Sequence, residues 1–308
     1  MGRDTGQAHP AVDAGSCLVA ETGKSEENLL NAAAPTFPQP QRPDPPMPVE
    51  IHPTAYVETG AELGEGTRVG PFCHVGPHAV IGAGSELRSH AVVIGHTTLG
   101  ENSVLHPHAV VGGPPQVIGF QETPESRLQI GNNCTFREYA TAHTGIPKFG
   151  GVTQVGDNCF IMIGAHIAHD NHIGNSVVMA NNVSLAGHIT VGDNVWFGGL
   201  AAVHQFTRIG RNAFIGGGAI LVEDVIPFGS VVGNHAKLSG LNMVGLKRRG
   251  FDKAQLQEIR GAYKAVFTGE GLFKDRLAQA AVTFADKPLA MEMIDFIRQG
   301  GDRPICKP

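Results

Sequence analysis

A period of six residues in the positions of aliphatic side chains is the feature that most constrains the fold of this chain. In steps of six, every position from Ile51 to Val111 is aliphatic, and between Val155 and Leu221 only Met179 and Phe197 depart from this rule. An amphipathic helix repeats at about 3.6 residues, so the pattern excludes one. It predicts coils of three short strands, with eighteen residues per turn and stacked coils about 4.8 Å apart. The predicted fold is an all-β left-handed parallel β-helix of hexapeptide repeats.

Small residues occupy a second position of each repeat, four residues after the aliphatic one, and we expect both positions to point inward. Three of the five cysteines (Cys73, Cys134 and Cys159) fall at that small position, which indicates buried side chains rather than reactive thiols. Glycine often follows the aliphatic residue, and we expect it to supply the positive φ that tight corners need. The cysteines are scattered and form no CxxC pair, which is typical of a reducing compartment, so we expect a cytoplasmic protein.

Charge and hydropathy argue against two kinds of partner. The formal net charge is -5 and charged residues make up 17% of the chain, which argues against binding to nucleic acid or to an anionic membrane surface. No apolar run approaches the roughly 18 residues that a transmembrane segment needs.

The repeat has limits along the chain. We predict a disordered Pro-rich extension at residues 1–50, with Met47 a candidate translation start, then the β-helix at 51–235 and a helical domain at 236–308. Helical periodicity begins after Asp252, a candidate N-cap, and continues over residues 271–284 and 288–299. Residues 117–129 and 142–154 do not fit the period of six, which predicts two loops that leave the coil.

Polar residues gather along one edge of the predicted coil. Because residues eighteen apart share a column, His169 stacks with Gly187 and Gln205, and Asp170 stacks with His188. Five side chains fall within five adjacent columns over three coils, an axial rise of about 10 Å; they are His166, His169, His188, His204 and Gln205. None is at an inward position, so packing of the core does not explain them. His172 lies three columns further on and is expected to be an ordinary surface residue.

Three interpretations of this edge remain open from the residues themselves. It can be a solvated polar edge, or a metal site, since histidine is a common ligand. The zinc hydratases with this fold, however, use two histidines five residues apart, and no two histidines here have that spacing. The third interpretation is acid–base catalysis, in which His169 removes a proton, Asp170 orients it and the Gly187 N–H binds an oxyanion.

Four stretches together resemble one family. The segments "IGAHIAHD", "ANNVSLAGH", "AVHQF" and "GLNMVGLKRRGF" are similar to those of the bacterial UDP-N-acetylglucosamine O-acyltransferases, which start lipid A synthesis. The resemblance covers about residues 51–270. It implies a homotrimer with active sites between the β-helices of neighbouring chains. We expect no metal or cofactor. The co-substrates would be a 3-hydroxyacyl thioester of acyl carrier protein and UDP-N-acetylglucosamine, which is acylated at the glucosamine 3-hydroxyl.

The resemblance also implies roles for single residues. His169 would be the general base, Asp170 its partner and Gly187 the oxyanion donor. The substrate-binding residues would be His166, His188, His204, Gln205, Gln116, Asn242, Arg248 and Arg249, with the two arginines near the phosphates. Lys247 is a candidate contact for the acidic carrier protein, with a solvated helix start as the alternative. Gly217 matches the position that limits acyl-chain length, and a glycine there would leave room for a chain of around fourteen carbons.

The sequence departs from the family at two places on the acceptor side. The usual Gln-Asp-Leu-Lys is Gln116-Val117-Ile118-Gly119 here, and the usual glutamate before the basic motif is Val244. A variant acceptor, such as a 3-amino UDP-sugar, is therefore an alternative. So is the related N-acyltransferase of the same pathway, although residues 1–50 are too short for its uridine-binding domain. A non-catalytic β-helix scaffold is the alternative outside the enzymes.

Overall fold

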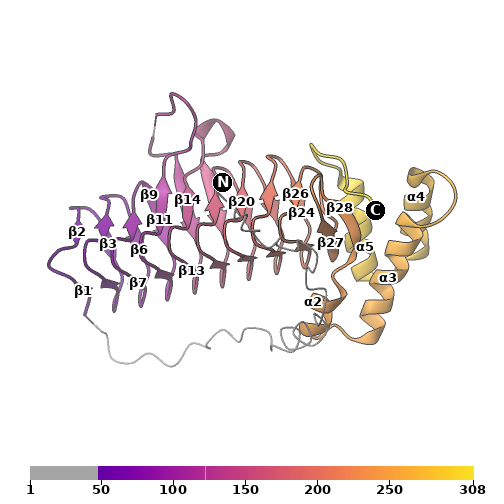
Figure 1. Cartoon of the computed structure of the whole chain (residues 1–308), viewed down its shortest axis with the longest axis horizontal. Coiled ribbons are helices and arrows are strands. Elements are labelled where there is room, and N and C mark those ends of the chain that lie inside the picture. Colours follow the sequence, from indigo (N-terminus) through magenta and orange to yellow (C-terminus); the bar gives the residue numbers. More distant parts are fainter. Residues whose placement is uncertain (1–47, 122) are drawn as a thin grey trace, which may run out of the picture. The chain divides into compact units, whose positions relative to one another are not determined.

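Three parallel β-sheets form the faces of a triangular coil, shown in Figure 1. The computed structural model describes residues 48–121 and 123–308. The coil begins at Glu50, so all but the last three residues of the expected Pro-rich extension lie outside the described residues. Strands of two residues alternate with turns, as the period of six predicts, and the left-handed parallel β-helix is confirmed.

Each complete coil supplies one strand to each sheet, and β28 pairs antiparallel with β27 at the end of sheet A. Sheet A contains β1 (Glu50–Ile51), β4 (Arg68–Val69), β7 (Glu86–Leu87), β10 (Val104–Leu105), β13 (Thr135–Phe136), β16 (Phe160–Ile161), β19 (Val178–Met179), β22 (Trp196–Phe197), β25 (Phe214–Ile215), β27 (Gly229–Val232) and β28 (Lys237–Leu241). Sheet B contains β2 (Tyr56–Val57), β5 (His74–Val75), β8 (Val92–Val93), β11 (Val110–Gly113), β14 (Thr141–His143), β17 (His166–Ile167), β20 (Ser184–Leu185), β23 (Ala202–Val203) and β26 (Ile220–Leu221). Sheet C contains β3 (Glu62–Leu63), β6 (Val80–Ile81), β9 (His96–Leu99), β12 (Arg127–Ile130), β15 (Val152–Val155), β18 (His172–Ile173), β21 (Thr190–Val191) and β24 (Arg208–Ile209). We name the turns between sheets the AB, BC and CA corners.

The register between coils confirms the column rule. Ile51 pairs with Val69 in sheet A and Val57 pairs with Val75 in sheet B, each eighteen residues apart. The aliphatic and small positions both point inward and form one continuous core. Cys73, Cys134 and Cys159 are at most 1% exposed, which confirms that they fill the interior.

Both loops leave the coil at the BC corner. Residues 114–126 join β11 to β12, and residues 144–151 join β14 to β15 and include the 3-10 helix η1 (Pro147–Phe149). The predicted loop bounds, 117–129 and 142–154, extend too far toward the C-terminus. Arg127–Ile130 and Val152–Val155, at the ends of these ranges, are strands that pair within sheet C. The insertions change the column spacing from eighteen to 31 at Leu99–Ile130 and to 25 at Phe136–Ile161, so a fixed step of six cannot follow the chain through them.

The expected role of the repeated glycines was wrong. Glycines that follow the aliphatic residue, such as Gly100 and Gly174, do not have positive φ; asparagines at the corners, such as Asn158 and Asn194, do. A Cβ on Gly100 would lie 2.5 Å from the Gly131 backbone, and one on Gly174 would lie 2.5 Å from Asp193 Oδ1. Glycine is therefore required because the next coil approaches closely, and not because of its backbone conformation.

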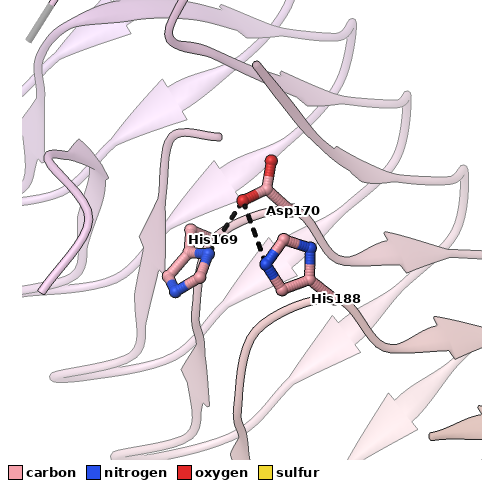
Figure 2. Close-up of side chains that lie close together, drawn as sticks. All are labelled: His169, Asp170 and His188. Atoms are coloured by element: carbon pink, nitrogen blue, oxygen red, sulfur yellow. Dashed lines mark hydrogen bonds and ion pairs between the residues drawn. The ribbon is translucent and has the colours of Figure 1, made fainter. Parts of the chain in front are cut away.

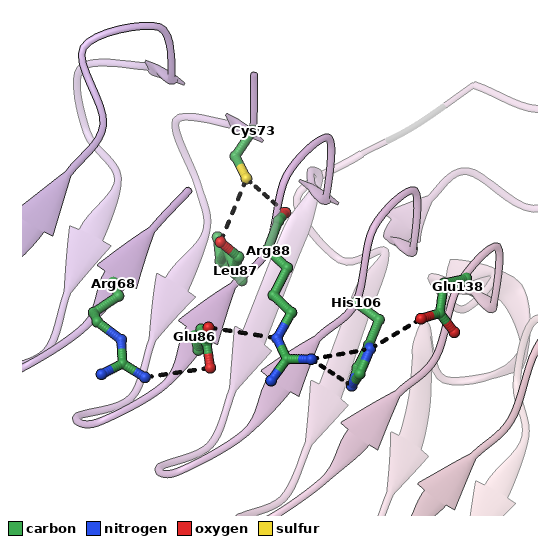
Figure 3. A network of polar contacts seen from close by, with 7 residues as sticks. All are labelled: Arg68, Cys73, Glu86, Leu87, Arg88, His106 and Glu138. Carbon is green, nitrogen blue, oxygen red and sulfur yellow. Dashed lines mark hydrogen bonds and ion pairs between the residues drawn. The ribbon is translucent and has the colours of Figure 1, made fainter. Parts of the chain in front are cut away.

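A chain of polar contacts runs along the outer side of the first coils (Figure 3). Arg68 bonds Glu86 at 3.3 Å, Glu86 bonds Arg88 at 3.4 Å, and Arg88 continues to His106 and Glu138. The two arginine–glutamate pairs are largely exposed, and such ion pairs contribute little to stability individually. Inside the same coils, the Cys73 thiol donates to the Arg88 carbonyl at 3.0 Å, so this cysteine also satisfies a backbone acceptor.

Four helices follow the coil: α2 (Met243–Arg248), α3 (Lys253–Phe267), α4 (Phe273–Thr283) and α5 (Pro288–Gln299). The three predicted helical segments match α3, α4 and α5, and Asp252 caps α3 in a capping box with Gln255. The chain then returns to the coil, where Ile305 pairs with Asp224. The expected domain limit at 235–236 falls between β27 and β28, which pair with each other, and it stays a prediction. No helix in the described part of the chain is long and apolar enough to cross a membrane.

Candidate active site

The predicted polar edge forms at the BC corner, where three successive coils meet. The His188 N–H donates to the His169 carbonyl at 3.1 Å, and the Phe206 N–H donates to the Gly187 carbonyl at 3.2 Å. This stacking brings together seven of the predicted residues, which we name the BC patch: His166, His169, Asp170, Gly187, His188, His204 and Gln205. His172 projects from sheet C and is exposed.

His169 and Asp170 form a hydrogen-bonded pair at the centre of the patch (Figure 2). The His169 Nδ1 lies 2.8 Å from Asp170 Oδ2. Because a carboxylate only accepts, Nδ1 carries a proton, which places the lone pair of the neutral ring on Nε2. Asp170 adopts a left-handed φ of 57°, which aspartate tolerates better than most residues. Its position in the turn is further fixed by its N–H, which donates to Thr153 Oγ1 at 2.8 Å.

The loop of residues 144–151 covers Asp170, which is only 4% exposed. The Ile146 N–H donates to Asp170 Oδ1 at 3.0 Å, so the two carboxylate oxygens hold the loop and the histidine separately. Phe149 of the same loop makes an edge contact with the His188 ring at 4.6 Å. The His188 ring also stacks on the Phe206 ring, with the ring centroids 4.7 Å apart. Burial lowers the pKa of His188, and the charge of Asp170 partly offsets this.

Gly187 lies directly against the His169 ring. A Cβ at this position would be 2.5 Å from His169 Cε1 and 2.9 Å from Nε2, so the histidine occupies the space of a side chain. The Gly187 N–H has no hydrogen-bond acceptor among residues 48–121 and 123–308. A buried N–H without an acceptor is rare, and this one is available to an oxygen that sits beside His169.

His166 and a histidine that the sequence reasoning missed, His143, lie on the sheet B side of the patch. His166 Nδ1 is 2.8 Å from Thr141 Oγ1, and its ring meets His143 edge-on at 5.0 Å. Burial lowers the pKa of both, and that of His143 falls to about 4, with the neighbouring His166 as the next cause. His143 shares a column with Ala168 and His204, and this column would have placed it at the patch. The 144–151 insertion changes the spacing between coils, so counting in steps of eighteen did not find the column.

A second residue that the sequence reasoning missed comes from the C-terminal tail. Arg303 Nη2 lies 2.7 Å from His204 Nδ1, and its Nε donates to the Gln205 carbonyl at 3.1 Å. The contact joins residues 99 positions apart, and no periodicity of the chain indicates it.

Three of the remaining predicted residues, Asn242, Arg249 and Gly217, lie at corners of the coil other than that of His169. Asn242 caps α2 and also donates to the Asn212 carbonyl at 2.9 Å, while Arg249 donates to Asn194 Oδ1 at 3.2 Å, so both are at the CA corner. Burial lowers the pKa of Arg249. Arg248 is exposed on α2, and Gln116 is exposed on the 114–126 loop at the BC corner. Gly217 is at the AB corner, across sheet B from His169, and has room for a Cβ, 3.4 Å from the Gly199 carbonyl.

The departures from the family pattern leave apolar side chains on the surface. Ile118 is fully exposed at the tip of the 114–126 loop, Val117 is 44% exposed and Val244 is 50% exposed. These positions carry no charge to offer a phosphate or a sugar.

His169, Asp170 and His188 also meet a geometric condition for holding a metal, since one ligand atom from each lies within 4.8 Å of the others. The short contact between His169 Nδ1 and Asp170 Oδ2, at 2.8 Å, is nevertheless that of a hydrogen bond. Two ligands of a zinc ion, each about 2.0–2.1 Å from it, lie further apart in a tetrahedral arrangement. The arrangement favours proton transfer over metal binding.

Comparison with known proteins identifies similar chains over most of the length. Residues 224–306 match the family model described as UDP N-acetylglucosamine O-acyltransferase, domain 2, and residues 60–95 and 78–113 match the bacterial transferase hexapeptide model. A protein of Rhizobium johnstonii named acyl-[acyl-carrier-protein]–UDP-N-acetylglucosamine O-acyltransferase is 49% identical over 84% of this chain and 94% of its own. One of the same name from Bartonella henselae is 48% identical over 84% and 94%.

Solved structures agree. The UDP-N-acetylglucosamine acyltransferase of Francisella novicida superposes with a TM-score of 0.80 at 33% identity, over 84% of this chain and 94% of its own. That of Campylobacter jejuni superposes with a TM-score of 0.79 at 36% identity, over 84% and 100%. These proteins share the coil and the helices that follow it.

Proposed function

This chain belongs to the acyl-[acyl-carrier-protein]–UDP-N-acetylglucosamine O-acyltransferase family, and from that premise we propose how the BC patch performs the reaction. The chain is an acyltransferase that catalyses the first step of lipid A synthesis, in which an acyl group moves from acyl carrier protein to UDP-N-acetylglucosamine. In our proposal the acyl group is a 3-hydroxyacyl chain and the acceptor is the glucosamine 3-hydroxyl.

His169 is the general base of the proposed reaction. The hydrogen bond from its Nδ1–H to Asp170 leaves the Nε2 lone pair to take the proton of the sugar hydroxyl. The hydroxyl oxygen attacks the thioester carbonyl, and the charge of Asp170 stabilises the imidazolium that forms. The observation that carries the proposal is this hydrogen bond between His169 and Asp170. The rest of the Asp170 carboxylate is covered by the 144–151 loop.

Gly187 binds the oxyanion of the tetrahedral intermediate. Its N–H has no acceptor in the described residues and lies beside the imidazole that accepts the proton. A fixed donor of this kind stabilises charge as it develops. When the intermediate collapses, the carbon–sulfur bond breaks, His169 returns its proton to the leaving thiolate, and the pantetheine thiol leaves as the ester remains on the sugar.

The small outward side chains of sheet B suit a groove for the acyl chain. Ser184 and Ala202 lie between the BC corner at His169 and the AB corner at Gly217, and a glycine at the end of this path adds no obstacle. We propose that the chain lies across this face, with Gly217 permitting a length of around fourteen carbons.

The nucleotide-binding residues require a second copy of the chain. Asn242 and Arg249 are held at the CA corner by Asn212 and Asn194, on the opposite edge of sheet C from His169. A site that unites them with His169 is complete only where the BC corner of one chain faces the CA corner of another. We therefore propose a homotrimer with the sites between chains, with Arg248 and Arg249 at the phosphates and Lys247 at the carrier protein.

Other parts of the proposal concern cofactors, location and alternatives. We propose that the reaction needs no metal or cofactor and takes place in the cytoplasm. The relatives are named as O-acyltransferases, which does not favour the N-acyltransferase or the scaffold. Wild-type protein should acylate UDP-N-acetylglucosamine in a panel of UDP-sugars and 3-hydroxyacyl carrier proteins; a panel without any product would refute the function.

The shared site can be tested by mixing two inactive variants. His169→Ala and Arg249→Ala are each expected to lose most activity, for different reasons. Trimers assembled from both contain interfaces with neither change, so activity should return on co-expression. Mixed assemblies that stay inactive would contradict a site built from two chains.

A further inference from the structure

The C-terminal tail brings a cation to the BC patch from outside the coil. After α5 the chain, yellow in Figure 1, returns to the last coils and is fixed there by backbone hydrogen bonds. The Asp224 N–H donates to the Pro304 carbonyl at 2.8 Å, the Cys306 N–H donates to the Asp224 carbonyl at 2.8 Å, and the Leu238 N–H donates to the Lys307 carbonyl at 3.0 Å. Cys306 is fully buried. The tail therefore has a defined position without any contribution from Arg303.

Arg303 uses only one edge of its guanidinium group for contacts within the chain. Nε and Nη2 lie on the same edge of an arginine, and they contact the Gln205 carbonyl and His204 Nδ1. The other edge, formed by Nη1 and Nη2, makes no hydrogen bond within residues 48–121 and 123–308. Among these residues Arg303 forms no ion pair with its neighbour in the chain, Asp302, or with Glu223.

The contact with His204 places the guanidinium group at the BC patch. His204 Nδ1 lies 2.7 Å from Arg303 Nη2 and 3.3 Å from the Gln205 carbonyl, which also accepts from Arg303 Nε. The Nη1–Nη2 edge of Arg303 is therefore held at the BC patch with N–H groups that no described residue accepts. A planar edge of this kind matches two oxygens of a phosphate.

We propose that Arg303 is a further substrate-binding residue of the acyl-transfer site, and that its free Nη1–Nη2 edge binds a phosphate group of a co-substrate. The proposal rests on the proposed function, which supplies two phosphates: the diphosphate of UDP and the phosphodiester of the 4′-phosphopantetheine arm. A guanidinium group binds either phosphate in the same way. The experiment has one arm for each phosphate and so shows which of them Arg303 binds.

The first arm compares acyl-4′-phosphopantetheine with acyl-pantetheine as donors, at saturating UDP-N-acetylglucosamine. The second arm compares binding of UDP with binding of uridine by calorimetry. Wild type, Arg303→Gln and Arg303→Lys are measured, with Arg298→Gln as a control, since Arg298 is an exposed arginine of α5 that forms an ion pair with Asp295. A phosphate hydrogen-bonded by arginine should raise kcat/KM or affinity about 10- to 100-fold.

We call the gain in kcat/KM or affinity from the phosphate the phosphate advantage. Arg303→Gln should lose this advantage in one arm, and that arm identifies the phosphate that Arg303 binds. Arg303→Lys should keep part of the advantage, because lysine still offers a point charge. In the donor arm the loss should appear in KM, with kcat little changed and the melting temperature equal to that of Arg298→Gln. An advantage that survives in Arg303→Gln in both arms overturns the proposal. Should Arg303→Gln fail to fold, Arg303→Lys decides by the same comparison. A wild type without transfer activity refutes the proposed function instead, and the calorimetric arm still tests Arg303.

Discussion

Asp170→Asn is the change that separates the two hydrogen-bonding tasks of the Asp170 carboxylate. Asp170 accepts one hydrogen bond from His169 Nδ1 and another from the Ile146 N–H, one on each oxygen. An amide has one oxygen, so one of these donors must lose its acceptor. Asparagine tolerates the left-handed backbone at this position, where φ is 57°, so the turn itself should be preserved.

The magnitude follows from which bond the amide keeps. If its oxygen stays with Ile146, its NH2 group faces His169 Nδ1, the proton of the imidazole moves to Nε2, and the base is lost. In serine proteases the same change of tautomer lowers kcat by about 10⁴. If the oxygen turns to His169, the loop loses its hydrogen bond, at a cost of about 1–3 kcal/mol in stability. We expect a kcat loss of about 10³ to 10⁴ with UDP-N-acetylglucosamine affinity little changed.

Asp157→Asn is the matched control. Asp157 Oδ1 accepts from the Asn132 N–H at the CA corner, and Asn175 already performs the same task one coil further on. One acceptor suffices there, so transfer activity should be within about twofold of wild type. Turnover is measured as acylated UDP-sugar by mass spectrometry, and binding by calorimetry. An Asp170→Asn enzyme with a kcat within tenfold of wild type and an unchanged stability would refute the proposed orientation of His169, because the amide would then have cost neither the base nor the loop its hydrogen bond.

Three further outcomes follow from the geometry of the patch. Gly187→Ala keeps the N–H but sets a methyl group 2.5 Å from His169 Cε1, which forces a shift of about 1 Å and a kcat loss of about 100-fold; a loss under threefold would show that the ring has room to move. Burial lowers the folded-state pKa of His143 to about 4, below the unfolded value of about 6.5. The stability that this residue contributes is therefore fully present above about pH 6.5 and is lost as the pH falls toward about 4. The loss at pH 5 is at most about 2 kcal/mol. Denaturant titrations at pH 7 and pH 5 should show a smaller loss for His143→Asn than for wild type, and equal losses would contradict the burial of a neutral ring. Exhaustive chelation should leave transfer activity unchanged, whereas a loss that zinc restores would show that His169, Asp170 and His188 hold a metal.

The sequence predicted the fold well because the period of six is a direct record of packing. Inward positions recur every six residues, so Ile51 and its successors identify the core, the coil and the column of each histidine without further information. His169, Gly187 and Gln205 could be stacked by arithmetic for the same reason. The arithmetic failed at the insertions, where the spacing of columns becomes 31 and 25, and it missed His143 for that reason alone.

Other features are not encoded in any local pattern. Arg303 reaches His204 because the tail folds back across the last coils, and such a contact depends on the tertiary arrangement of α3, α4 and α5. The glycine after each aliphatic residue is required because the neighbouring coil leaves no room for a Cβ. The sequence does not reveal this contact, so the backbone freedom of glycine was the wrong explanation. The roles of Asn242 and Arg249 in a site shared between two chains stay predictions.

The rate of the chemical step in His169→Ala tests the central claim most directly. A single turnover is followed with enzyme in excess, saturating UDP-N-acetylglucosamine and 3-hydroxyacyl carrier protein, with calorimetry to verify that UDP-N-acetylglucosamine still binds. Loss of a general base should slow the single turnover by about 10² to 10⁴ while affinity for the nucleotide is retained. A single-turnover rate within a few-fold of wild type would contradict the assignment of His169 as the base.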